Sequence, residues 1–438
     1  MGFCSVRKMI WTVSAFCRKE TLLVVSGGLA ALSCLLVRPD RLYLSYPDYR
    51  VLALLFSLML VIAGWQELGF FRWLGAALSR RVGTVRGLLW VLCGLCFFGS
   101  MLMTNDVALI TFVPFTIALL CRSGAERQLI SALVIETVAA NLGSMLTPVG
   151  NPQNLYLYSL SEMEPVVFLL HMLPIWAVSL VIVCGMILLQ KNSPLTAAEP
   201  QQPAHRSVVR SWRFWVFAGL FAFCLAGVLR FLPYWAVLVG ASVVVLLLNR
   251  RLFSCVNYSL LVTFLFFFIL IGNLGRVEAI RTFLSSAIAG NELWFGVGLS
   301  QIISNVPAAM LLAGFSTEYK ALLWGVNIGG LGTLIASMAS LISYQFYACL
   351  LYTSSSSPER KGANFPGSLP SRRLPSQNPS VRKKKLTAKL AAAARKTGIP
   401  ETPATRPVPR LFRVSPSPTA RASLTSMEPE TSRSERSA

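Results

Sequence analysis

Charged residues are scarce in this chain of 438 residues, where they account for 13% of positions against 54% for hydrophobic residues. Histidine occurs only at His171 and His205. The chain has no G-x-x-x-x-G-K-[ST] sequence, which excludes an ATP-driven pump domain. It also has neither a His/Glu zinc pattern nor a nucleophile elbow. We therefore expect no enzyme active site, no resident metal and no cofactor.

The scarcity of charge also indicates the class of protein. A mean hydropathy of +0.60 is too high for a soluble chain of this length and predicts an all-α polytopic membrane protein. The net charge of +22 would usually point to nucleic acid, but residues 353–438, with 17 basic and 5 acidic residues, carry +12 of it. Elsewhere the basic residues cluster between apolar runs, as orientation signals of membrane proteins do. We expect the lipid bilayer as a partner, and no nucleic acid.

One apolar run, residues 129–157, is interrupted by residues that disfavour a helix. Gly143, Pro148, Gly150 and Pro152 fall within ten residues. Each proline removes a backbone donor and costs a helix interior about 3 kcal/mol, and each glycine costs about 1 kcal/mol. Backbone groups freed at membrane depth are tolerated only where they line a cavity, and such breaks mark the binding sites of transporters.

The break recurs in the second half of the chain. When residues 141–150 are set over residues 327–336, Asn, Gly and Thr coincide at three of ten positions, and apolar or small residues pair between them. A hydroxyl residue followed by asparagine precedes each break, as Thr104-Asn105 in the first half and Ser304-Asn305 in the second. This repeated order indicates an internal duplication.

Counting Lys and Arg between the apolar runs gives an expected organisation. Residues 1–20 form a cytoplasmic N-terminus, 21–190 a first transmembrane repeat, 191–213 a cytoplasmic linker and 214–352 a second repeat. We predict a re-entrant helical hairpin near 88–120 followed by a broken helix over 129–157, and then a second hairpin over 293–315 followed by a broken helix over 322–344. The two hairpins enter from opposite faces, as inverted-topology repeats require.

Residues 353–438 differ in character from the rest of the chain. They are rich in Ser, Pro, Arg and Lys and cannot form a packed core, so we expect a basic disordered tail. A full apolar span, residues 166–189, follows the first break, whereas the second repeat lacks a matching last helix. We favour a frameshift or a misjoined segment near Leu350 over a natural tail that binds anionic lipid.

The hairpin tips and the breaks supply the candidate binding residues, because helix ends offer unpaired backbone groups and dipoles. They are Thr104, Asn105, Asn141, Gly143, Thr147, Gly150, Asn151 and Asn154 in the first half, and Ser304, Asn305, Asn327, Gly329, Gly330, Gly332 and Thr333 in the second. Small polar residues can instead serve only to pack membrane helices, which is the better interpretation of an isolated Gly or Ser. The recurring asparagines are costly in hydrocarbon unless they are used, so for them we favour binding.

Two carboxylates lie inside apolar runs, Asp106 at the first tip and Glu136 five residues before Asn141. Neither has an acidic counterpart in the second half. An intramembrane carboxylate is a candidate functional group, and either acid could coordinate Na+ or carry a proton as the coupling residue. The alternative is a structural carboxyl that accepts hydrogen bonds from backbone N–H groups at a helix end.

Several motifs occur in order along the chain: Thr-Asn-Asp-Val-Ala (104–108), Ala-Asn-Leu-Gly-Ser (140–144) with Gly-Asn-Pro-Gln-Asn (150–154), Ser-Asn-Val-Pro-Ala (304–308) and Asn-Ile-Gly-Gly-Leu-Gly-Thr-Leu-Ile-Ala (327–336). Together they resemble the ion transporter superfamily, and within it the citrate transporter-like and arsenite permease-like anion permeases, which are relatives of the divalent anion:sodium symporters. The resemblance covers approximately residues 20–350. It implies inverted repeats, secondary transport of an anion coupled to Na+ or H+, and an elevator-like movement.

We therefore expect an ion-coupled secondary transporter of a small anion, such as a di- or tricarboxylate or an inorganic oxyanion. A sodium/proton antiporter is the rival if the two acids make the site negative, and a channel or a non-transporting membrane scaffold is the alternative from another class. The expected location is the bacterial inner membrane with a cytoplasmic N-terminus. A homodimer is compatible with the sequence.

Overall fold

Helices account for all the regular structure in the computed structural model, which describes residues 20–79, 82–195 and 208–355. The predicted all-α membrane fold is confirmed. Helices long and apolar enough to cross a membrane are found at Tyr49–Glu67, Pro165–Leu188, Tyr234–Cys255 and Tyr258–Arg276. The predicted cytoplasmic N-terminus, the middle of the linker and nearly all of the tail at 353–438 lie outside the described residues.

The first half contains eight described α-helices. They are α2 (Thr21–Leu36), α3 (Tyr49–Glu67), α4 (Phe70–Ser79), α5 (Val85–Gly99), α6 (Asn105–Arg122), α7 (Leu129–Ser144), α8 (Pro152–Ser161) and α9 (Pro165–Leu188), with short 3-10 turns at η1 (Arg41–Ser45) and η2 (Glu126–Gln128). Local sequence explains where several begin. Asp48 accepts the Val51 N–H to start α3, and Asn151 accepts the Asn154 N–H at α8, whose first residue is the favoured proline.

The second half follows with eight more. They are α10 (Trp212–Val228), α11 (Tyr234–Asn249), α12 (Tyr258–Arg276), α13 (Glu278–Ile288), α14 (Glu292–Ile303), α15 (Asn305–Ala313), α16 (Tyr319–Gly329) and α17 (Met338–Ser355), with a 3-10 turn at η3 (Arg250–Cys255). The described residues up to Leu350 pack as one unit. This unit contains every pair of helices discussed below.

Both predicted interruptions are present in the described chain. Helix α7 ends at Ser144 and α8 begins at Pro152, so residues 145–151 separate them, and residues 330–337 separate α16 from α17. The helices before each break form a hairpin. The α5–α6 hairpin turns through residues 100–104, whereas the α14–α15 hairpin turns at Ser304 alone.

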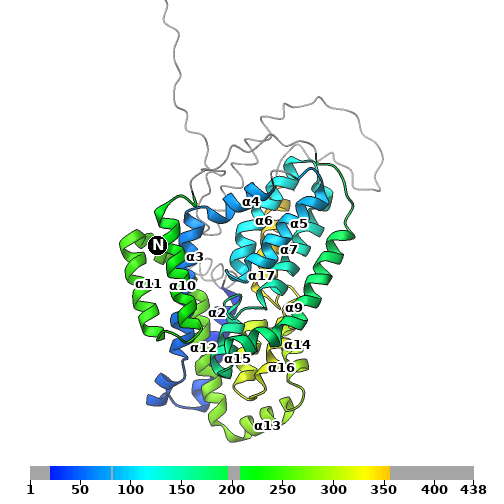
Figure 1. The fold of residues 1–438 in the computed structure, drawn as a ribbon. Helices are drawn as coiled ribbons and strands as arrows, with labels where there is room; N and C mark the ends of the chain where they lie inside the picture. Colours follow the sequence, from blue (N-terminus) through cyan, green and yellow to red (C-terminus); the bar gives the residue numbers. More distant parts are fainter. Residues whose placement is uncertain (1–19, 80–81, 196–207, 356–438) are drawn as a thin grey trace, which may run out of the picture. The chain divides into compact units, whose positions relative to one another are not determined.

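The two halves repeat the same packing. Helix α7 packs against both helices of the α5–α6 hairpin, and α16 packs against both helices of the α14–α15 hairpin. Helix α8 then packs against α15 and α16 of the other half. In Figure 1 the α5–α7 group occupies the upper part of the described unit and the α14–α16 group the lower part, and the breaks lie between them.

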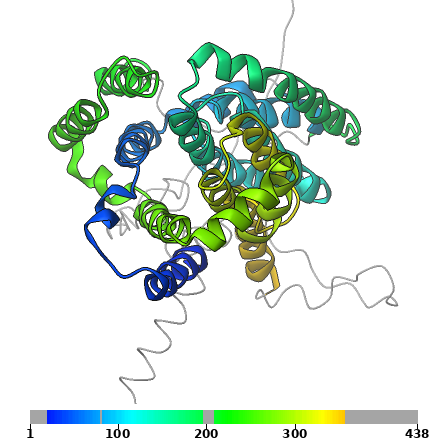
Figure 2. The ribbon, with the colours of Figure 1, turned by 90° about the horizontal axis from the view of Figure 1, so that it is seen from below.

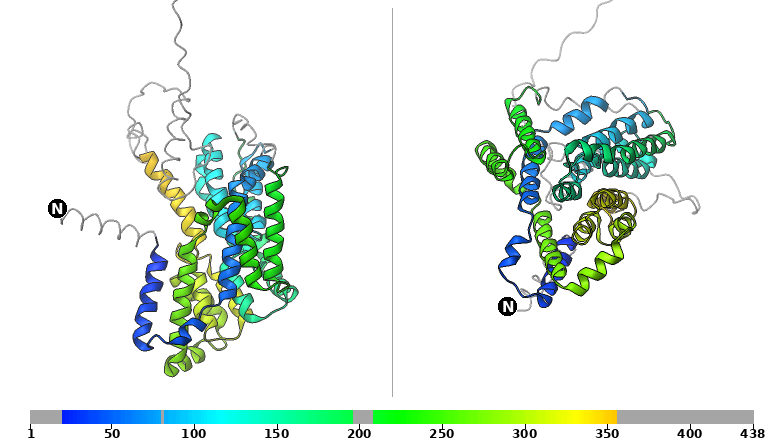
Figure 3. Two further views of the ribbon diagram at one scale, coloured as in Figure 1. Left: turned by 90° about the vertical axis from the view of Figure 1, so that its left-hand side faces the viewer. Right: turned by 60° about the horizontal axis from the view of Figure 1, so that its bottom comes forward.

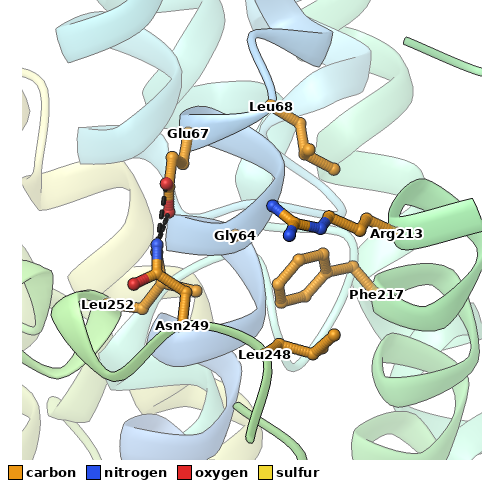
Figure 4. A pocket seen from close by; sticks show the side chains of 8 residues that line it. All are labelled: Gly64, Glu67, Leu68, Arg213, Phe217, Leu248, Asn249 and Leu252. Carbon is orange, nitrogen blue, oxygen red and sulfur yellow. Dashed lines mark hydrogen bonds between the residues drawn. The ribbon is translucent and has the colours of Figure 1, made fainter. Parts of the chain in front are cut away.

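The remaining helices surround these two groups. Helix α3 packs against α10 and α11, which Figure 3 shows in blue and green. Helix α2 packs against α12 at the edge of the unit, as the view from below shows (Figure 2). A pocket of about 20 Å³, roughly the size of one water, lies where α3, α10 and α11 meet (Figure 4). There Asn249 Nδ2 donates to both carboxylate oxygens of Glu67 at 2.7 Å.

Candidate functional site

Each hairpin tip is bonded to the break of its own half. The Asn105 backbone N–H donates to the Gly150 carbonyl oxygen at 3.2 Å, and the Asn305 N–H donates to the Ala336 carbonyl oxygen at 2.9 Å. Gly150 and Ala336 are the last residues of the two aligned segments, 141–150 and 327–336. The same backbone contact therefore occurs twice, at matching positions.

The threonines of the breaks form a second matching pair of contacts. Thr147 Oγ1 donates to the Met101 carbonyl oxygen at 2.6 Å, and Thr333 Oγ1 donates to the Gln301 carbonyl oxygen at 3.0 Å. Met101 and Gln301 each lie four residues before the asparagine of the tip. Thr147 thus bonds the first break to the turn of the α5–α6 hairpin, and Thr333 bonds the second break to α14, the helix before the second tip.

Asn141 connects the first hairpin to the second half. Its Oδ1 accepts Asn105 Nδ2 at 2.8 Å and Ser337 Oγ at 2.9 Å, and its Nδ2 donates to the Thr137 carbonyl oxygen at 3.1 Å. Ser337 is the last residue of the second break. One amide therefore joins the first tip, α7 and the residue before α17.

Asn327 makes the reciprocal connection from the second half. Its Oδ1 accepts Asn151 Nδ2 at 3.0 Å, and its Nδ2 donates to Asn154 Oδ1 at 2.7 Å and to the Leu323 carbonyl oxygen at 2.8 Å. Asn151 stands one residue after Gly150, just as Ser337 stands one residue after Ala336. Asn141 and Asn327 thus occupy matching positions of the two aligned segments, and each accepts a bond from the other half.

We call this set of bonded side chains the asparagine network. Its members are Asn105, Asn141, Ser144, Asn151, Asn154, Asn327 and Ser337, and each is at most 4% exposed. A buried amide left without a partner costs about 1 to 3 kcal/mol, so the network makes the arrangement of the two breaks specific. It contains no Lys, Arg or His.

Helix ends converge on the asparagine network. Helices α6, α8, α15 and α17 begin beside it, and helices α5, α7, α14 and α16 end beside it. Helix N-termini carry partial positive charge and unpaired N–H groups that attract anions, whereas C-terminal carbonyl groups attract cations. The junction of the breaks therefore offers groups of both kinds without a charged side chain.

The second tip is strained where the first is not. Ser304 has φ +78° and ψ 153°, a backbone region that is almost exclusive to glycine, whereas Thr104 has φ −61°. The Ser304 hydroxyl makes only long contacts of 3.4 Å, to Asn305 Oδ1 and the Ala336 carbonyl oxygen. Ser304 therefore has a backbone conformation that favours glycine, and its hydroxyl forms only weak hydrogen bonds with neighbouring residues.

The predicted glycines have an evident packing role. A Cβ at Gly143 would lie 1.9 Å from the Phe97 carbonyl oxygen, and a Cβ at Gly329 would lie 2.7 Å from Ser300 Cβ. Gly143 thus allows α5 and α7 to cross closely, and Gly329 allows the equivalent crossing of α14 and α16. At Gly330 and Gly332 a Cβ would meet Asn305 Nδ2 and Gln301 Oε1. Direct binding by these glycines stays a prediction.

The two acids lie in different places. Asp106 is in the first turn of α6, next to the asparagine network, and its carboxylate has no hydrogen bond within the described part of the chain. Glu136 is fully buried and accepts a hydrogen bond from Thr116 Oγ1, while its Oε2 has no partner among the described residues. Thr116 lies eleven residues beyond Asn105, about 16 Å along the helix axis. On α7, Glu136 lies five residues before Asn141, about 7.5 Å along the helix axis, and its carboxylate is bonded to Thr116 and not to Asn105.

Sequence reasoning missed three residues that organise the site: Ser144, Ser337 and Gln301. Ser337 could have been found by extending the alignment of the breaks by one residue, to Asn151. Gln301 accepts the Thr333 N–H at 2.8 Å and donates to the Gly329 carbonyl oxygen, so its side chain bridges the second break. That break is also more open than the first: Leu334 and Ile335 are 50% and 65% exposed.

Comparison with known proteins adds an independent finding. Residues 9–342 match the family described as citrate transporter. The inner membrane protein YbiR of Escherichia coli (strain K12) is 32% identical over 305 residues, 68% of this chain and 79% of the relative. The uncharacterized transporter MJ0456 of Methanocaldococcus jannaschii is 29% identical over 326 residues, 74% of this chain and 87% of the relative. A shorter match, 36% identity over 140 residues, covers 32% of this chain and 28% of the silicon efflux transporter LSI3 of Oryza sativa subsp. japonica.

Proposed function

The chain belongs to the citrate transporter family, and from that premise we propose that it carries a small anion across the membrane, coupled to Na+ or H+. The observation that carries the proposal is the reciprocal bonding of the asparagine network, Ser337 to Asn141 and Asn151 to Asn327. It joins two broken helices of opposite halves at one place. Discontinuous helices meeting at a repeat interface are the usual substrate site of secondary transporters.

The anion is held by neutral groups. The N-termini of α6, α8, α15 and α17 supply partial positive charge, and the asparagine amides supply N–H donors. Because the asparagines are bonded to one another, a substrate oxygen enters by replacing an amide acceptor. The Ser337 hydroxyl and the Asn151 amide, which donate across the two halves to Asn141 Oδ1 and Asn327 Oδ1, then donate to the substrate instead.

The coupling ion is assigned to the same region. Carbonyl groups at the C-termini of α5, α7, α14 and α16 offer oxygen ligands of the kind Na+ prefers, and Asp106 is the nearby acid. Glu136 accepts a hydrogen bond from Thr116 on α6, and its Oε2 has no partner among the described residues, which suits a proton carrier better than an Na+ ligand. Na+ coupling through Asp106 and H+ coupling through Glu136 are thus distinct variants of the proposal.

Substrate movement requires the binding region to shift against a frame. We assign the hairpins and broken helices to the moving part, and α3, α10 and α11, which pack against one another, to the frame. We propose a bacterial inner membrane as the location, which the similarity to an inner membrane protein of Escherichia coli supports. The distribution of Lys and Arg between the apolar runs supports a cytoplasmic N-terminus.

The test is uptake by proteoliposomes under separate Na+ and pH gradients. The labelled substrates are citrate, succinate, sulfate, arsenite and silicic acid, the last because one relative carries the name of a silicon efflux transporter. We expect saturable accumulation of at least one substrate, driven by one of the two gradients. Exchange of Na+ for H+ with no substrate uptake would identify the antiporter instead, which the two acids favour. Flux that neither saturates nor follows a gradient would identify a channel.

A further inference from the structure

A cleft lies between the first residues of α3 and the turn that joins α10 to α11, segments that are distant in sequence from both breaks. It has a volume of about 350 Å³ and is lined by two arginines and by the residues of the turn: Arg50, Arg230, Phe231, Leu232, Pro233 and Tyr234. Counting Lys and Arg between the apolar runs predicts that the loop before α3 and the Pro233 turn both lie on the outer face of the membrane. None of the residues of the asparagine network lines this cleft.

Arg230 is held in an unusual conformation at the edge of the cleft. Its φ of +68° lies in the left-handed region, where glycine or asparagine would be favoured. Its guanidinium lies 5.3 Å from the centre of the Tyr158 ring, and Nη2 donates to the Tyr158 carbonyl oxygen at 3.2 Å. Its Nε is buried and has no hydrogen-bond partner among the described residues. Arg230 thus has a strained backbone, a guanidinium held against Tyr158, and an Nε–H without a hydrogen-bond acceptor among the described residues.

Arg50 supplies a second guanidinium, and no carboxylate forms an ion pair with it within the described chain. Within the described chain its side chain makes no hydrogen bond, and the only ion pair found there joins Arg276 to Asp40. Arg50 and Arg230 repel each other electrostatically, and the acids that act on Arg50 are Asp48 and Glu162. The Asp48 carboxylate is already engaged by the Val51 N–H and by Ser159 Oγ.

We propose that this cleft binds a phosphate-like oxyanion between Arg50 and Arg230. Two planar guanidinium groups match the oxygens of such an anion through charge-assisted hydrogen bonds, and one bound anion would remove their mutual repulsion. The anion has two sources, a free oxyanion or the phosphate of a lipid headgroup. The apolar rim favours the lipid, because Phe231 is 78% exposed and Tyr234 and Trp235 are also exposed, as residues at a membrane interface are.

The experiment measures binding to the full-length protein purified in an uncharged detergent. Thermal unfolding is followed with inorganic phosphate alone, and separately with phosphatidylglycerol, whose retained copies are also counted by native mass spectrometry. The test variants are Arg50→Gln and the double variant Arg50→Gln/Arg230→Gln. The single variant separates binding from folding, because Arg50 makes no hydrogen bond in the described structure. Matched controls are Arg41→Gln and Arg281→Gln, which remove equal charge from exposed positions.

We expect saturable stabilisation of the parent protein and of both controls, and a fall in affinity of about tenfold or more in Arg50→Gln. Stabilisation by phosphate alone would identify a free oxyanion as the source. Stabilisation and retention with phosphatidylglycerol only would identify a lipid headgroup. Equal binding of both probes by Arg50→Gln and Arg41→Gln would overturn the proposal. Because the readout is binding and not transport, failure here would leave the proposed function unaffected.

Discussion

The bond between Asn151 and Asn327 across the two halves permits a quantitative prediction. Asn327→Ala removes that bond and also leaves Asn154 Oδ1, in a side chain with no exposed surface, without its partner. An unsatisfied buried acceptor costs about 1 to 3 kcal/mol. Asn151→Ala likewise leaves the buried Asn327 Oδ1 without its donor, and it also removes the cap of α8, worth about 1 kcal/mol. We therefore expect Asn151→Ala to lower the free energy of unfolding by about 1 kcal/mol more than Asn327→Ala does.

The double variant measures the bond itself. Hydrogen bonds between membrane helices contribute about 0.6 kcal/mol on average and up to about 1.7 kcal/mol. The double variant should therefore be more stable than the sum of the single effects predicts, by an amount in that range. Unfolding is measured in detergent for the parent, both single variants and the double variant, and gradient-driven uptake is measured for the same four proteins.

A matched cycle controls for burial. Asn273 Nδ2 donates to Ser33 Oγ at 2.9 Å between α2 and α12, so it forms a similar buried pair away from the breaks. Asn273→Ala and Ser33→Ala should show a comparable coupling in stability and unchanged uptake. Additivity of Asn151→Ala and Asn327→Ala within about 0.3 kcal/mol, with uptake intact, would refute the functional role of the bond.

The other predictions concern the tip, the glycines and the acids. Ser304→Gly should raise the free energy of unfolding by about 1 to 3 kcal/mol because it relieves the backbone strain, and Ser304→Ala should not. If the Ser304 hydroxyl binds substrate, both variants should raise the KM of uptake. Gly143→Ala should lower the free energy of unfolding by about 1 to 3 kcal/mol, because the added Cβ meets the Phe97 carbonyl oxygen of α5. Gly94→Ala is the control, because a Cβ there meets no other atom within 4 Å. Equal melting temperatures of the two variants would contradict this reasoning. Asp106→Asn should abolish Na+ dependence if coupling is to Na+, and Glu136→Gln should abolish dependence on the pH gradient if coupling is to H+. Unchanged coupling in both acid variants would remove these acids from the mechanism.

Most residues of the asparagine network could be predicted from the sequence. Glycine and proline predict the breaks after Ser144 and Gly329, and the internal duplication predicts that Asn105, Asn141 and Asn327 belong to the site. The same alignment, continued by one position, pairs Asn151 with Ser337 and would have predicted the reciprocal bonds. Ser337 was missed because the aligned segments ended at Gly150 and Ala336.

Other features depend on geometry that a single sequence does not encode. Gln301 has a methionine at the matching position, Met101, so no repeated residue type marks it. The positive φ of Ser304 arises because its hairpin turns at a single residue. Glu136 and Asn141 lie five residues apart on α7, but Glu136 meets Thr116 whereas Asn141 meets Asn105, eleven residues earlier on α6.

The most direct test of the central claim compares one variant from each half with a buried asparagine elsewhere. Uptake of whichever labelled substrate the parent protein accumulates is measured for Asn141→Ala, Asn327→Ala and Asn273→Ala, reconstituted at equal protein content. We predict that Asn141→Ala and Asn327→Ala both lose most of the gradient-driven uptake, and that Asn273→Ala retains it. Transport by Asn141→Ala and Asn327→Ala at the parent rate and KM would show that substrate does not pass through the asparagine network.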